Sequence, residues 1–139
     1  MLPPVFLDTS FIIALENPHD EHHVRAHELD SALTDGGRKY VLHAGILCEI
    51  GDGFARLERR QRGNFLLSQF LLSDGYEVVM LSNDLLADGA KLYQSRPDKT
   101  WGLTDCISFV VMRQHSIVAA LTADVHFQQA GFQAMLLES

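Results

Sequence analysis

The sequence predicts an α/β fold with a mainly parallel central sheet, and two observations support that prediction. Short apolar runs typical of buried strands alternate with longer segments of helical periodicity, the arrangement expected when helices connect parallel strands. Prolines, glycines and small polar residues also separate these segments at the expected boundaries. The strand-like runs, in chain order, are PVFL, KYVLH, YEVVML, IVAALT and QAMLL.

Start and stop signals place the helices between these runs. The first helix is predicted from Thr9 to about Asn17, where Pro18 ends it, and the second from a cap at Asp20 to the glycines at 36 and 37. A third follows KYVLH, with apolar residues at helical spacing as far as Leu57. The others are NFLLSQFLLSDG, a segment capped by Asn83 or Asp84 that ends before Pro97, and a helix capped by Thr104.

Composition limits the organisation of the chain. Its 139 residues, 47% of them hydrophobic, suffice for one domain spanning residues 1–139 but not for two. Cys48 and Cys106 fit no metal-binding spacing, so we expect two buried free thiols. No basic leader and no apolar run of about 20 residues is present, so we expect a cytoplasmic protein without membrane contact.

The formal net charge of −7 argues against a protein that coats nucleic acid through a basic surface. It leaves room for a local acidic site. The stretch VFLDTSFIIAL places Asp8 alone in an apolar run, at a predicted strand-to-helix corner. Asp, Thr and Ser also cap helices, so this stretch taken alone favours capping.

Acids recur at corners of the same kind. Glu49 lies in the first turns of a predicted helix, Asp105 in the first turn of TDCISFVVM, and Asp124 directly after IVAALTA. In a parallel sheet the carboxyl ends of the strands share one edge, so these acids and Asp8 can converge there. Such convergence raises carboxylate pKa values unless a cation is bound.

Oxygen ligands favour Mg²⁺ or Mn²⁺, and the absence of paired His or Cys makes a zinc site a poor fit. Phosphodiester hydrolysis is the chemistry that such a centre suits. Nearby hydroxyls are expected to orient the carboxylates or bound water, namely those of Thr9, Ser10, Thr104 and Thr122.

The segments FLDTSFIIAL, LCEI, LTDCISFVVM and LTADVHFQQAGF, in this order, resemble the PIN-domain ribonucleases, in particular the VapC-like toxins of toxin–antitoxin pairs. The resemblance spans nearly the whole chain. It implies a three-layer α/β/α sandwich, an Mg²⁺ or Mn²⁺ cofactor, endonucleolytic cleavage of RNA, a homodimer and a small antitoxin partner. The catalytic acids it implies are Asp8 (with Ser10), Glu49, Asp105 and Asp124.

The metal is expected on Asp8, Asp105 and Asp124, with Asp124 and Glu49 acting mainly through water or substrate positioning. Val125 stands where the family often has a basic residue, so a phosphate contact there is in doubt. The run RLERRQRG, on the predicted helix that carries Glu49, offers RNA phosphate contacts; a solvated helix end with favourable dipole placement is the alternative. The arginines meant are Arg56, Arg59, Arg60 and Arg62.

Several alternatives stay open. His19, His23 and His27 share a helix face that could bind a transition metal, although packing or capping is the simpler role. Trp101 could stack on a base or anchor a loop. A non-catalytic PIN-like RNA- or partner-binding module is the main rival to an enzyme. Apolar helix surface predicts dimer contacts, or alternatively sheet-covering residues, at Phe65, Leu66, Phe70 and Leu86.

Overall fold

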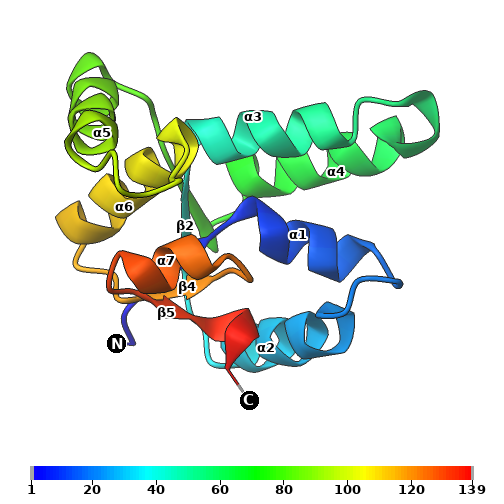
Figure 1. Ribbon diagram of the computed structural model, residues 1–139. Helices are drawn as coiled ribbons and strands as arrows, with labels where there is room; N and C mark the ends of the chain where they lie inside the picture. Colours follow the sequence, from blue (N-terminus) through cyan, green and yellow to red (C-terminus); the bar gives the residue numbers. More distant parts are fainter. Residues whose placement is uncertain (1, 139) are drawn as a thin grey trace.

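The computed structural model describes residues 2–138, and a five-stranded sheet runs through it (Figure 1). All neighbouring strands are parallel, in the order β3-β2-β1-β4-β5. The prediction of a parallel α/β fold is confirmed. The strands are β1 (Val5–Leu7), β2 (Tyr40–His43), β3 (Tyr76–Val79), β4 (Ala119–Leu121) and β5 (Gln133–Ala134).

Strand register aligns the functional edge of the sheet. Phe6 pairs with Val41 on one side and with Ala120 on the other. Because β1, β2 and β4 run in the same direction, the residues that follow them leave the sheet at one edge. Three helices begin there, namely α1 (Thr9–Glu16), α3 (Ala44–Gly53) and, after a short turn, α7 (Val125–Gln129).

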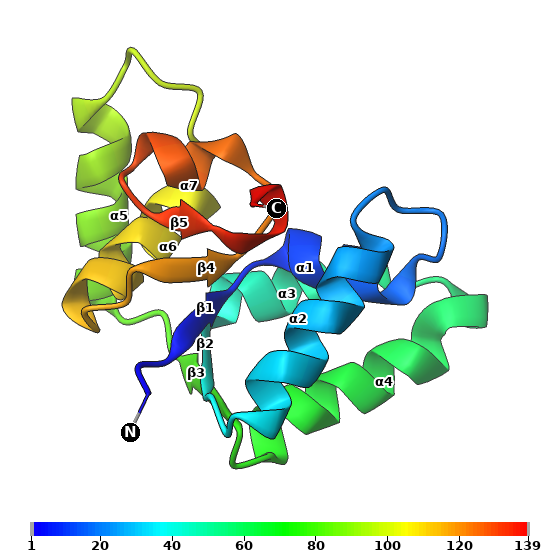
Figure 2. The same cartoon turned by 90° about the horizontal axis from the view of Figure 1, so that it is seen from below.

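Helices cover both faces of the sheet, giving the predicted α/β/α layers (Figure 2). On one face, Tyr40 donates a hydrogen bond to Asp30 and Tyr76 packs against Phe70. This face carries α1, α2 (His23–Asp35) and α4 (Leu57–Leu72). The other face packs against α7 and α6 (Leu103–Gln114), and α5 (Asn83–Ser95) packs on α6.

The second face holds an aromatic core beneath the acidic edge. The ring of Phe6 lies 6.1 Å from those of His43 and Phe127, and Phe109 packs edge-on against Phe127 at 5.0 Å. These side chains are all fully buried. Gly89 allows α5 to approach α6 closely, because a Cβ there would lie 2.6 Å from Cγ1 of Ile107. The helix that carries Asp105 is therefore tightly packed on both sides.

The third helix is predicted to extend as far as Leu57, which is too long. In the structure α3 ends at Gly53, with Phe54 as its C-cap, and a separate helix, α4, begins at Leu57 after Arg56. The apolar spacing continues across this break because Phe54 packs against α4, where Gly63 leaves room for it: a Cβ on Gly63 would lie 2.8 Å from that of Phe54. The arginine run therefore begins α4 and does not share a helix with Glu49.

This boundary also removes the favourable dipole placement. The N-terminus of a helix carries partial positive charge, so arginines at the start of α4 gain nothing from it.

Other helix and strand boundaries also differ from the predicted ones. Asp20 bonds the backbone of His22 one turn before α2 begins, and Gly102 is the N-cap of α6 in place of Thr104. The last two strand-like runs form shorter strands than expected; β4 covers only Ala119–Leu121, and β5 passes directly into a 3₁₀ turn, Met135–Leu137.

Two of the four predicted dimer contacts lie in the core. Leu66 is 4% exposed and Phe70 is 2% exposed, so they cover the sheet within the chain. Phe65 and Leu86 are exposed.

Both cysteines are free as predicted, but Cys48 is exposed because it lies on the outer side of α3. Within residues 2–138, no helix combines the length and apolar character needed to cross a membrane.

Candidate functional site

The four predicted acids lie at the carboxyl edge of the sheet. Asp8 follows β1 and is the N-cap of α1, Glu49 lies on α3, Asp105 lies in the first turn of α6, and Asp124 is the N-cap of α7 after β4. Figure 1 shows the starts of these helices gathered near the end of β1. The predicted local positions hold: Asp8 and Asp124 lie directly after the strand runs, Asp105 lies in the first turn of its helix, and Glu49 lies in the first two turns of the helix after β2.

Asp8 is held by hydroxyl groups in a buried position. Its Oδ2 accepts hydrogen bonds from Ser10 Oγ at 2.9 Å and Thr122 Oγ1 at 2.8 Å. Burial raises the pKa of Asp8 to about 6; the two hydroxyls lower it in part, and the charges of Asp105 and Asp124 raise it further. Its side chain makes no capping bond to α1, so the two hydroxyls and not the helix N-terminus orient the carboxylate.

The same hydroxyls connect β1 to the segment after β4. Thr122 Oγ1 accepts the backbone N–H of Asp124 at 3.0 Å, and Ser10 Oγ accepts that of Ala123 at 3.1 Å. Asp8 and Asp124 are therefore positioned by one network, although 113 residues separate Ser10 from Ala123. The predicted supporting contacts of Ser10 and Thr122 are present in the structure.

Asp105 and Asp124 face a histidine that the sequence prediction did not include. Nδ1 of His126 lies 3.0 Å from Oδ2 of Asp105 and 3.3 Å from Oδ1 of Asp124. Ligand atoms of the three residues all lie within 4.8 Å of one another. The sequence did hold a sign of this histidine, because His126 comes two residues after the predicted acid Asp124. Its backbone N–H donates to Asp124 Oδ1 at 2.9 Å.

Electrostatics match this crowding of carboxylates. Burial raises the pKa of Asp105, the hydrogen bond from His126 lowers it, and the charge of Asp124 raises it. The backbone N–H of Gly102 also donates to Asp105 Oδ2 at 3.3 Å. The carboxylate of Asp105 is thus fixed from two sides, by the start of its own helix and by α7.

Glu49 joins the site through a hydroxyl. Its Oε1 accepts a hydrogen bond from Thr9 Oγ1 at 2.8 Å, and Thr9 is the residue after Asp8. Glu49 is exposed and lies outside the group of three ligand atoms around His126. The supporting contact predicted for Thr9 is present. Among the described residues, the hydroxyl of Thr104 has no hydrogen bond to an acid.

A buried histidine anchors the two helices that carry Glu49 and Asp105. His43 Nδ1 accepts the backbone N–H of Gly45 at 3.0 Å, so its proton resides on Nε2, which donates to Ser108 Oγ at 3.0 Å. Ser108 in turn donates to the carbonyl of Thr104. Burial lowers the pKa of His43 to about 4, against a smaller opposing effect of the Thr104 carbonyl. This neutral chain joins the first turns of α3 and α6.

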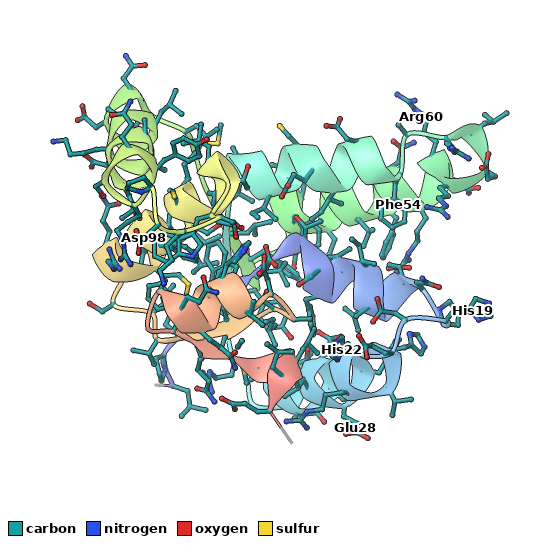
Figure 3. The ribbon with its side chains drawn as sticks, viewed as in Figure 1. His19, His22, Glu28, Phe54, Arg60 and Asp98 are labelled. Atoms are coloured by element: carbon teal, nitrogen blue, oxygen red, sulfur yellow. The ribbon has the colours of Figure 1, made fainter. Side chains whose placement is uncertain are left out.

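The arginines predicted to bind RNA are exposed but lie away from the acids. Figure 3 shows Arg60 at the far end of α3 and α4, opposite the start of α3. Its guanidinium donates to the carbonyl of Ala55 at 2.9 Å. Arg62 instead pairs with Glu16. Arg56 and Arg59 are exposed and their role in RNA binding stays a prediction.

The remaining candidates have structural partners. His23 and His27 donate to the last carbonyls of α1, those of Ala14 and Leu15, which supports the capping role. Trp101 is 5% exposed and its indole N–H donates to Gln129, so it anchors a loop and offers no face to a base. A cavity of about 340 Å³ between α1, α2 and α4 contains none of the four acids.

The donor set fits a divalent cation. Carboxylate oxygens of Asp105 and Asp124 face a common space with one imidazole nitrogen, and the carboxylate of Asp8 contributes its charge to both. Clustered carboxylates with partly raised pKa values are the electrostatic pattern that a bound cation relieves. Oxygen-rich ligand sets of this kind suit Mg²⁺ and Mn²⁺.

Comparisons with known proteins agree with this geometry. The family model of the PIN domain matches residues 5–133. Among solved structures, Mycobacterium tuberculosis VapC20, described as a toxin that cleaves the sarcin–ricin loop, is 25% identical, with a TM-score of 0.77 over 92% of this chain and 95% of its own.

Two FitAB structures share the fold. FitAcB from Neisseria gonorrhoeae is 22% identical over 94% of each chain, with a TM-score of 0.66. FitAB bound to an IR36 DNA fragment is 21% identical over 97% of each chain, with a TM-score of 0.67. No curated protein sequence matches the chain.

The buried His43 predicts a specific loss of stability in acid. The unfolded histidine takes up a proton below pH 6.5, whereas the folded one does so only near pH 4, so protons favour unfolding in that window. Between pH 7.5 and pH 5 this lowers the free energy of unfolding by about 2 kcal/mol. In His43→Asn, which keeps an acceptor for Gly45, that component is expected to vanish.

Urea unfolding of both proteins at the two pH values measures it. The opposing contribution of Asp8, whose folded pKa is raised, is common to both proteins and cancels in the comparison. An equal change of stability with pH in wild type and variant would contradict the assignment.

Proposed function

Because the chain belongs to the PIN-domain family, we propose that residues 1–139 form a single Mg²⁺- or Mn²⁺-dependent endoribonuclease domain, the toxin of a toxin–antitoxin pair. The observation that carries this proposal is the convergence of Asp105 and Asp124 on one point, beside the hydroxyl-held Asp8. The similarity to VapC20, a toxin that cleaves an RNA loop, supports RNA as the substrate class.

Each acid has a distinct part in this proposal. Asp8, Asp105 and Asp124 hold the cation, which when bound activates water and screens the negative charge of the phosphate. Ser10 and Thr122 fix the carboxylate of Asp8, so that it faces the other acids without rearrangement. Glu49, exposed and bonded to Thr9, is free to orient a water molecule or the substrate at the rim.

The rival proposal is a PIN-like module that binds RNA or a protein partner without cleavage. The gathering of four acids at one edge of the sheet favours the enzyme, because a binding module has no need to concentrate carboxylates against an anionic ligand. A small antitoxin is part of the proposal on the strength of the similarity to a toxin. Incubation of the protein with total RNA, with and without Mn²⁺ or Mg²⁺, separates the two proposals.

Asp105→Asn tests the metal centre. The substitution keeps the shape of the side chain and removes its charge, so the cleavage rate is expected to fall about 100-fold or more, together with divalent-ion affinity. Asp52→Asn on the exposed side of α3 is the matched control and is expected to cleave as wild type does. Wild-type activity in folded Asp105→Asn would refute the mechanism.

The double variant Arg59→Glu, Arg60→Glu tests the exposed start of α4. If these side chains neutralise phosphates, RNA affinity falls and the slope of log K against log salt becomes shallower by about 1.5, because fewer counterions are released. Binding is measured in the Asp105→Asn background to prevent cleavage. Arg38→Glu, Lys39→Glu, before β2 at the opposite edge of the sheet, makes the same charge change; an equal effect there would exclude a specific contact.

A two-fold homodimer completes the proposal. Large apolar side chains are exposed from the end of α4 to the start of α5: Leu71, Leu72, Met80, Leu81 and Leu86. A second copy of the chain would cover exposed apolar side chains of this kind. Light scattering at micromolar concentration is expected to give a dimer for wild type and for Val118→Asp, an exposed residue before β4, and a monomer for Leu86→Asp. A monomeric wild type would refute the dimer, and a folded, dimeric Leu86→Asp would remove that residue from the interface.

A further inference from the structure

One histidine, His126, contacts both Asp105 and Asp124 in the acidic site. It is the second residue of α7, a quarter of its side chain is exposed, and Nδ1 points between the two carboxylates. An anion lies on each side of that nitrogen, at 3.0 Å and 3.3 Å. Such a nitrogen is stable there only with a proton on it or with a cation shared between the three groups.

The other ring nitrogen has its own partner. Nε2 of His126 lies 3.1 Å from Oγ1 of Thr100, in the loop between α5 and α6. When the Nε2 proton is donated to this hydroxyl, Nδ1 presents a lone pair to the space between Asp105 and Asp124. A histidine that binds a metal commonly donates its other N–H in this way, which fixes its tautomer and ring orientation.

We propose that His126 Nδ1 is a ligand of the divalent cation together with Asp105 and Asp124, and that this nitrogen makes the site prefer Mn²⁺ to Mg²⁺. The inference rests on the proposed metal-dependent function of the same site. Mg²⁺ selects oxygen ligands and retains its water, whereas first-row transition metals accept imidazole alongside carboxylate. A mixed nitrogen and oxygen set therefore shifts selectivity toward the transition metal.

The two carboxylates keep their anchors when the imidazole is removed. Asp124 Oδ1 accepts the backbone N–H of His126, which any substitution other than proline retains, and Asp105 Oδ2 still accepts the N–H of Gly102. His126→Ala thus removes one ligand atom and leaves the acids in place. His115→Ala, at the C-cap of α6, is the matched control, because His115 bonds the carbonyl of Val111 outside the acidic site.

Calorimetric titration with MnCl₂ and with MgCl₂ measures selectivity without RNA. Wild type and His115→Ala are expected to bind Mn²⁺ more tightly than Mg²⁺, and His126→Ala to lose about tenfold or more in Mn²⁺ affinity with a smaller loss for Mg²⁺. Thr100→Val, which removes the partner of Nε2, is expected to lose less. An unchanged affinity ratio in folded His126→Ala overturns the proposal. A gain in affinity for both ions also overturns it, because it identifies His126 as a cationic clamp on the acids.

Pulsed electron paramagnetic resonance of bound Mn²⁺ tests the nitrogen directly. Modulation from a coordinated imidazole nitrogen, changed by ¹⁵N-histidine labelling, is expected in wild type and in His115→Ala and absent in His126→Ala. Its absence in wild type overturns the ligand assignment. RNA cleavage by the same samples keeps the two proposals apart: nitrogen coordination without cleavage supports the ligand and contradicts the nuclease, and cleavage without coordination does the reverse.

Discussion

The carboxylate of Asp8 and the two hydroxyls that hold it join the parts of the chain on which the site depends. Ser10 lies in the first turn of α1 and Thr122 is the first residue after β4, so their hydrogen bonds to one oxygen of Asp8 connect two neighbouring strands at the edge of the sheet. The same hydroxyls accept the N–H groups of Ala123 and Asp124. The position of the last acid is therefore a consequence of how the first acid is satisfied.

A second chain of hydrogen bonds, on the other side of β1, joins β2 to α6. His43 ends β2, and through Ser108 it reaches the first turn of α6 across 65 residues of sequence. The bonds of Thr122 to Asp8 and of His43 to Ser108 are buried, and in a low-dielectric interior satisfied hydrogen bonds hold a unique arrangement while unpaired groups are costly. Between them they fix the starts of α1, α3, α6 and the turn before α7. The acidic edge is thus rigid because the polar groups beneath it have specific partners.

The sequence contained enough to predict the sheet and the placement of the four acids, because apolar runs and helix boundaries are local properties. It was less informative where tertiary packing decides. Phe54 keeps its apolar spacing while leaving the helix, since Gly63 on α4 provides the space that it fills. The apolar spacing of Leu66 and Phe70 along α4 fits a core face and a dimer contact equally well. Only the position of the sheet shows that they are core residues. His126 and Thr100 are 26 residues apart, and their bond follows from the approach of the α5–α6 loop to α7.

The energetics of Asp8 show why the site favours a cation. The folded protein binds the Asp8 proton more tightly than the unfolded chain does, so raising the pH from well below 3.8 to well above 6 lowers stability by about 3 kcal/mol in the absence of a counter-charge. The cause is first the burial of the carboxylate and only then the charges of Asp105 and Asp124. Near neutral pH, folding therefore creates a buried negative charge that its hydroxyl partners only partly stabilise. A divalent cation bound beside Asp8, as proposed, would recover this free energy and so couple metal affinity to the burial of the carboxylate.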